Sequence, residues 1–220
     1  MSVAENLDHI HTDIRTAAED AQRDADDVTL VAVSKKQPPE RIEEALEAGH
    51  KVFGENRVQE AYEHWEALKK THDDLVLHLI GPLQSNKAAD AVALFDVIET
   101  IDREKIAKTV AKEMAKQGRD LPCFIQVNTG EEEQKSGVVP ARLKEFYDYC
   151  YYECGLKIIG LMCIPPIDEP PALHFSLLKK YAEQLGLSKL SMGMSADYEA
   201  AIKLGATHIR VGTGIFGERE

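Results

Sequence analysis

The sequence predicts an α/β fold, a single (β/α)8 TIM-type barrel preceded by one extra N-terminal helix. Eight short apolar runs alternate with helical patterns along the 220 residues. Alternation of this kind places parallel strands side by side through right-handed crossovers. The runs are apolar at successive positions, as parallel strands are when helices cover both faces of their sheet. An open, doubly wound sheet is the alternative architecture, and the count of eight strands favours the barrel.

The extra helix is expected over residues 4–24, where Ile10, Ile14, Ala17 and Ala21 recur on one face. The expected strands follow at 28–34, 51–54, 75–81, 96–101, 123–128, 157–162, 189–192 and 208–212. The second and seventh of these are weak strands. Helical patterns occupy 39–49, 55–70, 103–118, 140–154, 172–185 and 195–205. The first of them starts with a proline and stops at a glycine, which are common helix boundary signals.

No linker, repeat or low-complexity segment divides the chain, so residues 1–220 are expected to form one domain. The formal net charge of −12 argues against nucleic acid and against an anionic membrane surface as partners, since both attract basic residues. No apolar run is long enough to span a bilayer, and the N-terminus lacks the layout of a secretory signal. We therefore expect a cytoplasmic protein, and a monomer because no apolar surface stripe demands a partner.

No metal centre is expected from the four cysteines. Cys123 and Cys163 lie inside apolar runs, where cysteine packs as a small core residue. Cys150 and Cys154 are four positions apart near a helix end, without the C-x-x-C pairs of a metal or redox site. A reducing compartment accommodates all of them as thiols.

In a barrel of this kind, functional side chains collect at the C-terminal ends of the strands. The first expected strand ends in Ser34, Lys35 and Lys36, and the second is followed by Asn56. The loops after the last two strands, at 192–195 and 212–217, combine glycines with hydroxyls ahead of a helix. Such loops often bind phosphate, because backbone N–H groups at a helix start favour an anion. Tight strand-to-helix turns explain the same glycines equally well.

Closure of the barrel would bring these loops beside the first strand. An anion bound at 195 and 212–214 would then lie near Lys35 and Asn56. A lysine beside a phosphate site is the arrangement that pyridoxal 5'-phosphate requires, since its aldehyde forms a Schiff base with a lysine amine. Arg210 shares the alternation phase of Gly212 and would face the pyridine nitrogen, to which an arginine can only donate. From these residues alone, a solvated lysine and an ion pair at the barrel rim are the simpler interpretations.

Strand alternation separates the two lysines without choosing between them. Lys35 is in phase with Val31 and Val33, and Lys36 is in the opposite phase. Only one of the two can point into the barrel while the strand persists. Both faces of this strand are apolar, so periodicity leaves the choice open.

Several longer motifs make the sequence similar to a known family. They are "AVSK" (32–35), "FGENRVQE" (53–60), "HLIGPLQSNK" (78–87), "TIDR" (100–103), "KSG" (135–137), "GLM" (160–162), "LSMGMSADYEAAI" (190–202) and "IRVGTGIFGERE" (209–220). From about residue 4 to its end, the chain resembles the pyridoxal phosphate homeostasis proteins, which are single-domain relatives of the alanine racemase barrel.

The resemblance implies a role for each candidate residue. Lys35 matches the Schiff-base lysine, Asn56 a residue lying along the cofactor, and Arg210 the arginine near the pyridine ring. Lys135, in "KSG", matches a second lysine associated with passing the cofactor on. The residues that match the phosphate cradle and its surroundings are Met194, Ser195, Gly212, Thr213 and Gly214.

The chain departs from common family residues at Lys36, Leu77 and Gly214. The first two positions often carry threonine and tryptophan, and the third often carries alanine. None of the departures removes a group expected to contact the cofactor. They leave the implied site intact.

The function implied by the resemblance is to bind pyridoxal phosphate and buffer its supply without significant turnover, with PLP-dependent apo-enzymes as candidate recipients. A weak amino-acid racemase-like enzyme is the alternative, and a lysine Schiff-base aldolase is a third. A racemase needs a second acid or base on the opposite face of the ligand, and the chain is too short for the domain that supplies it. An arginine at the ring nitrogen also keeps that nitrogen unprotonated. Both points favour a protein that holds and releases the cofactor.

Overall fold

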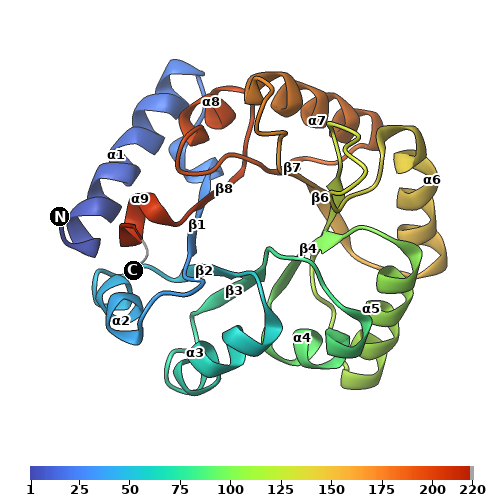
Figure 1. Ribbon diagram of the computed structural model, residues 1–220, viewed down its shortest axis with the longest axis horizontal. Helices are drawn as coiled ribbons and strands as arrows, with labels where there is room; N and C mark the ends of the chain where they lie inside the picture. The colour runs from blue at the N-terminus through green and yellow to red at the C-terminus, as the bar shows by residue number, and fades with distance from the viewer. Residues whose placement is uncertain (219–220) are drawn as a thin grey trace.

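The computed structural model describes residues 1–218 and contains a closed barrel of parallel strands in the order β1 to β8. Helices form a ring outside the strands (Figure 1). The predicted barrel is therefore confirmed, and the open sheet is wrong. The strands are β1 (Thr29–Val33), β2 (Val52–Glu55), β3 (Val76–Leu79), β4 (Val97–Ile101), β5 (Cys123–Val127), β6 (Ile158–Cys163), β7 (Lys189–Ser191) and β8 (His208–Val211).

Helices follow the strands along the chain. They are α1 (Val3–Asp20), α2 (Pro39–Glu47), α3 (Val58–Thr71), α4 (Ala88–Leu94), α5 (Glu104–Gln117), α6 (Leu143–Asp148), α7 (Pro171–Leu185), α8 (Tyr198–Lys203) and α9 (Thr213–Phe216). Short 3-10 turns occur at η1 (Ala25–Asp27), η2 (Ser85–Lys87) and η3 (Pro140–Arg142), and a π turn at η4 (Tyr149–Glu153). No helix within residues 1–218 is both long and apolar enough to cross a bilayer.

The extra N-terminal helix is α1, and it packs on the outside of the barrel against α2, α8 and α9. Its start is a capping box, in which the Ser2 hydroxyl accepts from the Glu5 N–H and the Glu5 carboxylate accepts from the Ser2 N–H. Its buried face contacts α8 and α9, so the two ends of the described chain lie side by side (Figure 1). The Asn6 amide donates to the carbonyl of Ile215 at 2.8 Å and fixes α1 to α9.

Several helices are shorter than expected, each for a local reason. The first ends at Asp20 rather than 24, because Gln22 adopts the left-handed region at φ 55°. The helix expected over 195–205 begins at Tyr198, because the carboxylate of Asp197 accepts from the N–H of Met194 and closes a turn. The stretch 140–154 is divided into η3, α6 and η4. One helix, α4, was not expected, and it is a seven-residue element rich in alanine.

Closure of the barrel depends on the pairing of β1 with β8. Val31 lies opposite Arg210 in this pair, and Ala32 lies opposite Phe53 in the pair with β2. Strands one and eight are therefore neighbours, as the predicted barrel required. The loops that follow these strands lie at the same end of the barrel.

The strands of the barrel separate two buried regions, one between the strands and the surrounding helices and one inside the barrel. Outward-facing side chains such as Leu30 and Ile209 join one large apolar core beneath the helices. Inside the barrel, Val97, Phe124 and Met162 form a separate small apolar cluster. Two positions beyond Val97 and Phe124 lie the polar residues Glu99 and Gln126, because side chains of one face recur every second residue. The barrel therefore has an apolar lower layer and a polar layer closer to the strand ends.

Candidate functional site

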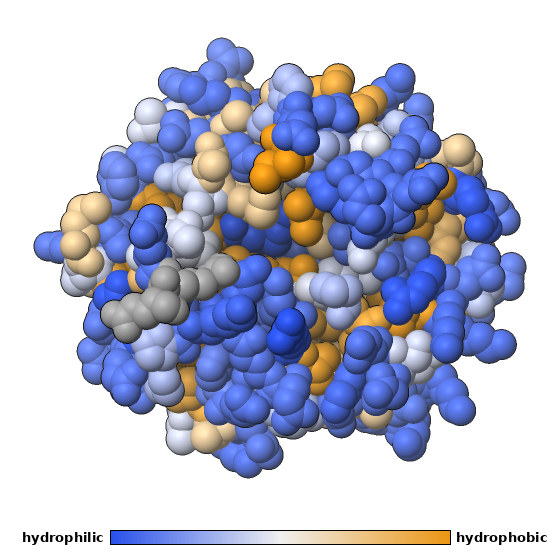
Figure 2. All heavy atoms as spheres, in the orientation of Figure 1, coloured by the Kyte–Doolittle hydropathy of each residue, from blue (hydrophilic) through white to orange (hydrophobic). Residues whose placement is uncertain are grey.

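A cavity of about 310 Å³ lies at the C-terminal ends of β1, β2 and β8. Figure 2 shows a largely hydrophilic face with apolar residues around a central hollow. The cavity brings together residues from distant parts of the chain that the sequence had singled out. They are Lys35, Asn56, Met194, Ser195, Arg210, Gly212 and Thr213. Apolar side chains complete its lining, namely Val33, Ile80, Ile164 and Ala196.

A turn separates the two lysines at the end of β1. The strand stops at Val33, and Lys36 takes the left-handed conformation at φ 58°. Lys36 is exposed, and its backbone N–H donates to the carboxylate of Glu60. Lys35 is half-buried and lines the cavity. Strand alternation does not reach either lysine, because β1 ends at Val33, and the turn separates them instead.

The two glycine-containing loops meet at the other side of the cavity. The N–H of Gly214 donates to the hydroxyl of Ser195 at 3.3 Å, which joins the loop after β7 to α9. Gly212 precedes α9, and Thr213 is its exposed first residue. The segment 212–217, which was expected to be a loop before a helix, therefore contains helix α9. Two hydroxyls and the first N–H groups of α9 form a donor set suited to an anion.

Asn56 is held in place by the close approach of the next loop. It follows β2 directly, and the segment after β3 passes beside it with Gly81 at the contact. A Cβ atom on Gly81 would lie 2.2 Å from the carbonyl oxygen of Asn56, so only glycine fits there without a backbone shift. Thr100 reinforces this segment by donating to the carbonyl of Gly81 at 2.8 Å.

Arg210 forms the inner end of the cavity and is 4% exposed. Its guanidinium donates from Nη1 to the hydroxyl of Ser191 at 2.6 Å and from Nη2 to the carbonyl of Cys163 at 2.8 Å. The Ser191 hydroxyl donates to Glu99 Oε2 at 2.5 Å. His78 Nδ1 donates to Glu99 Oε1 at 2.6 Å. This set of Arg210, Ser191, Glu99 and His78 is called the interior network below.

Sequence reasoning missed three members of the interior network. His78, Glu99 and Ser191 are buried polar residues of the short strands β3, β4 and β7. Their common signal was a polar residue at an inward-facing strand position. Finding their partners required the closed barrel, because Ser191 and Glu99 are 92 positions apart.

Burial and neighbouring charges decide the ionisation of the interior groups. Burial alone would raise the pKa of Glu99, but the hydrogen bond from His78 and the electrostatic interactions with His78 and Arg210 outweigh it and lower the pKa to about 2. Burial lowers the pKa of His208 to about 4. At neutral pH the carboxylate is therefore charged and His208 is neutral.

Comparison with known proteins supports this picture. Residues 6–220 match the family model for the alanine racemase N-terminal domain. The chain is 40% identical to the pyridoxal phosphate homeostasis protein of Aquifex aeolicus over all of both chains. It is 37% identical to that of Escherichia coli K12, over 99% of this chain and 97% of the relative. The chain belongs to the pyridoxal phosphate homeostasis protein family.

Solved structures place the fold in the same family. PipY of Synechococcus elongatus, solved without PLP and with PLP bound, superposes with TM-scores of 0.87 and 0.86 at 35% identity. Both matches cover 98% of this chain and 100% of PipY. Alanine racemase of Clostridium difficile shares the fold at 14% identity and a TM-score of 0.71, over 99% of this chain and 56% of the racemase.

Lys135, the second lysine implied by resemblance to the homeostasis family, does not line the cavity. Its ammonium pairs with Glu132 at 2.6 Å and donates to the carbonyl of Pro165 at 3.3 Å. Pro165 directly follows Ile164, which does line the cavity. Lys135 therefore connects the loop after β5 to the loop at the cavity rim.

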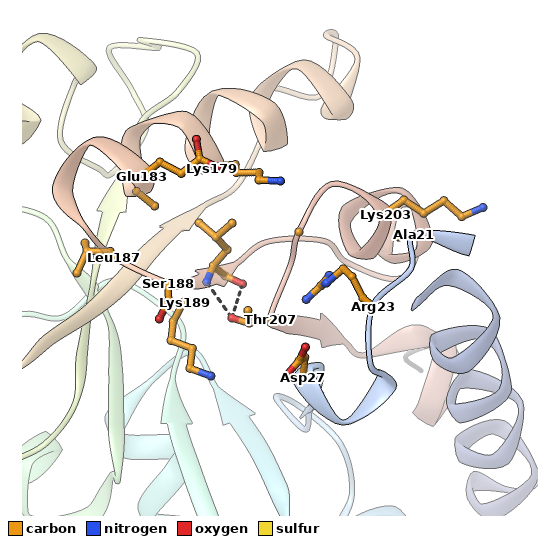
Figure 3. A pocket seen from close by; sticks show the side chains of 13 residues that line it. Ala21, Arg23, Asp27, Lys179, Glu183, Leu187, Ser188, Lys189, Lys203 and Thr207 are labelled. Carbon is orange, nitrogen blue, oxygen red and sulfur yellow. Dashed lines mark hydrogen bonds between the residues drawn. The ribbon is translucent and has the colours of Figure 1, made fainter. Parts of the chain in front are cut away.

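A larger cavity of about 500 Å³ lies at the opposite end of the barrel, beside the starts of β7 and β8 (Figure 3). It contains none of the residues that match the homeostasis family's site. Its charged lining residues are Arg23, Asp27, Lys179, Glu183, Lys189 and Lys203. Lys203 is paired with Asp20 at 2.8 Å. The other lining charges are three positive and two negative, so the cavity has no strong preference for an anion.

Among residues 1–218, no group of three or more His, Cys, Asp or Glu side chains is arranged to hold a metal ion. The cysteines are free, and burial raises the pKa of the Cys123 and Cys163 thiols to about 12. At neutral pH both are protonated thiols within the apolar core, which matches the sequence interpretation of small core residues.

Proposed function

We propose that this chain binds pyridoxal 5'-phosphate in the 310 Å³ cavity, attached to Lys35 as a Schiff base, and holds and releases it as part of cofactor homeostasis. The observation that carries the proposal is the convergence of one lysine, one arginine and an anion-binding donor set on a single cavity. The PLP-bound structure of PipY, at 35% identity, supports it.

The donor set fits the cofactor at both of its ends. The hydroxyls of Ser195 and Thr213, together with backbone N–H groups at the start of α9, would hold the phosphate dianion. Arg210 would face the ring nitrogen, with Asn56 along the ring and Met194 at the rim. When bound, the cofactor supplies an electrophilic aldehyde carbon and an electron-withdrawing ring. The four apolar lining residues would exclude water from the ring.

The cavity suits retention better than turnover. Lys35 is the lining group that would act as an acid or base, since arginine stays protonated. Within residues 1–218 the lining supplies no second acid or base facing it. Arg210 can only donate to the ring nitrogen, which keeps that nitrogen unprotonated and weakens the ring as an electron acceptor. These features support a carrier without significant catalytic turnover.

The remaining assignments follow from this proposal. Residues 1–220 would act as one cofactor-binding domain, as a cytoplasmic monomer. PLP-dependent apo-enzymes would receive the cofactor. Lys135 would assist its passage from the rim of the cavity rather than from inside it, through its bond to the carbonyl of Pro165.

A weak racemase-like activity is the second candidate, because the family model that matches is shared with alanine racemase. It is tested by incubating the PLP-loaded protein with L-alanine and separating the enantiomers. We expect no D-alanine above the level formed by free cofactor. Accumulation of D-alanine that requires Lys35 would establish the enzyme instead.

Titration of the unliganded protein with pyridoxal phosphate tests the main proposal. We expect the visible absorption of a pyridoxal Schiff base, its loss in Lys35→Ala, and its retention in Lys36→Ala as the matched control. A wild-type protein that stays colourless at saturating cofactor would refute the proposal. Loss of the band in Lys36→Ala alone would refute the choice of lysine.

A further inference from the structure

Arg210 carries a buried charge at the inner end of the cavity. A buried guanidinium is costly unless hydrogen bonds and an opposite charge compensate for it. Its two bonds within the protein go to the Cys163 carbonyl and the Ser191 hydroxyl, and both acceptors are neutral. The opposite charge must therefore come from a group beyond them.

Glu99 is that group. It is fully buried, and β4 lies four strands from β8 in the closed barrel, so its carboxylate approaches Arg210 from the opposite wall. The Ser191 hydroxyl accepts from Arg210 and donates to Glu99, so one oxygen atom connects the two charges. The other carboxylate oxygen accepts from His78. Both oxygens are thereby fixed, and the carboxylate cannot rotate without breaking a bond.

Glu99 and Ser191 do not line the cavity, whereas Arg210 does. Any effect of Glu99 on a ligand must therefore pass through the guanidinium. The guanidinium is planar and its donors are directional, so its plane decides which acceptor on a ligand it can reach. That plane is set by the bond through Ser191 on one side and the Cys163 carbonyl on the other.

We propose that Glu99 is a positioning residue for Arg210, which through Ser191 sets the direction of the guanidinium toward the ring of bound pyridoxal phosphate. This inference rests on the proposed function, which places that ring beside Arg210. Glu99→Gln keeps the shape of the side chain and removes its charge. The guanidinium would then lose its counter-charge and its fixed plane.

The affinity for pyridoxal phosphate, measured in the wild-type and Arg210→Gln backgrounds, tests the role of Glu99. We expect Glu99→Gln to weaken the binding of pyridoxal phosphate about tenfold, the loss typical of one hydrogen bond to a charged group. It should also shift the absorption maximum of the bound cofactor, because the ring nitrogen loses its oriented donor. In an Arg210→Gln background the same change should have no further effect. Ser191→Ala, a milder change, should behave as Glu99→Gln does.

Glu55→Gln is the matched control, because the Glu55 carboxylate is also fully buried and bonds to Ser34, His64 and Trp65 instead. Its effect on affinity should be equal in both backgrounds. Equal effects of Glu99→Gln in both backgrounds, or none in either, would overturn the proposal.

Urea unfolding of the unliganded variants separates this inference from the proposed function. Glu99→Gln should destabilise the wild-type background more than the Arg210→Gln background, because only the single variant Glu99→Gln leaves Arg210 as a buried cation without its counter-charge. If this coupling appears while the wild type takes up no pyridoxal phosphate, the proposed function fails and the pairing stands. If the wild type binds the cofactor and no coupling appears by either measurement, the inference fails.

Discussion

At the residue scale, the site depends on which of two adjacent lysines enters the cavity. Lys35 lines the cavity, and Lys36 is exposed with a left-handed backbone. The sequence could place the pair at a strand end but could not choose between them, because the choice is made by a turn. The resemblance to the homeostasis family selected the same lysine for an independent reason.

Two hydroxyls at the opposite side of the cavity give a prediction at this scale. Ser195→Ala and Thr213→Ala should each weaken retention of pyridoxal phosphate by about 1.5–3 kcal/mol, because each removes one hydrogen bond to a charged group. The Schiff base absorption should persist in both. Equilibrium dialysis against the free cofactor measures the loss, and unchanged affinity in the double variant would contradict the proposed cradle.

At the element scale, most site residues lie outside the strands, with Arg210 of β8 as the exception, and the sequence predicted strands better than loops. Alternating apolar runs located every strand, since burial on both faces leaves a clear pattern. The helices α4 and α9 were less predictable, because short elements are held by packing against neighbours more than by their own sequence. The position of Asn56 also depends on a contact with a different loop, through Gly81.

Gly81 gives the prediction at the element scale. Gly81→Ala would place a Cβ atom 2.2 Å from the Asn56 carbonyl oxygen, so the loop after β2 must move. We expect destabilisation of about 1–3 kcal/mol together with weaker cofactor binding. Denaturant unfolding and cofactor titration measure the two effects.

Gly118→Ala is the control for this change. Gly118 ends α5 at φ 66°, and no atom lies within 4 Å of its added Cβ. It should lower stability by about 1 kcal/mol through backbone strain alone and leave cofactor affinity unchanged. Equal loss of affinity in both variants would show that Asn56 is not involved.

At the scale of the whole molecule, barrel closure assembles what no local pattern contains. The interior network joins residues of β3, β4, β7 and β8. In the sequence, its members are scattered over four separate strands with nothing local to pair them. The strand count predicted the closure, but the depth and the partners of each inward side chain follow only from the pairing registers. The fold was therefore predictable, and so was the convergence of Lys35, Asn56 and Arg210 on one cavity, while the partners of Arg210 inside the barrel were not.

Buried histidines make the stability of the whole molecule depend on pH. Burial lowers the pKa of both His50 and His208 to about 4, from 6.5 in the unfolded chain. Between these pH values the unfolded state binds more protons, so the free energy of unfolding should fall as pH falls from 6.5 to 4, by up to ~3 kcal/mol for each histidine. Glu99, with its pKa lowered to about 2, adds a further loss only below about pH 4.5.

Urea titrations at pH 7, 5.5 and 4.5 measure this dependence. His50→Gln should reduce the slope, since one of the two buried imidazoles is then absent. A free energy of unfolding that stays constant or rises as pH falls through this window would contradict the burial of neutral histidines.

The covalent attachment of pyridoxal phosphate to Lys35 is the central claim, and one measurement tests it most directly. The cofactor-loaded protein is reduced with borohydride, digested, and its peptides are analysed by mass spectrometry. We expect the reduced pyridoxyl group on Lys35. A label on Lys36 or Lys135, or no labelled peptide at all, would contradict the claim.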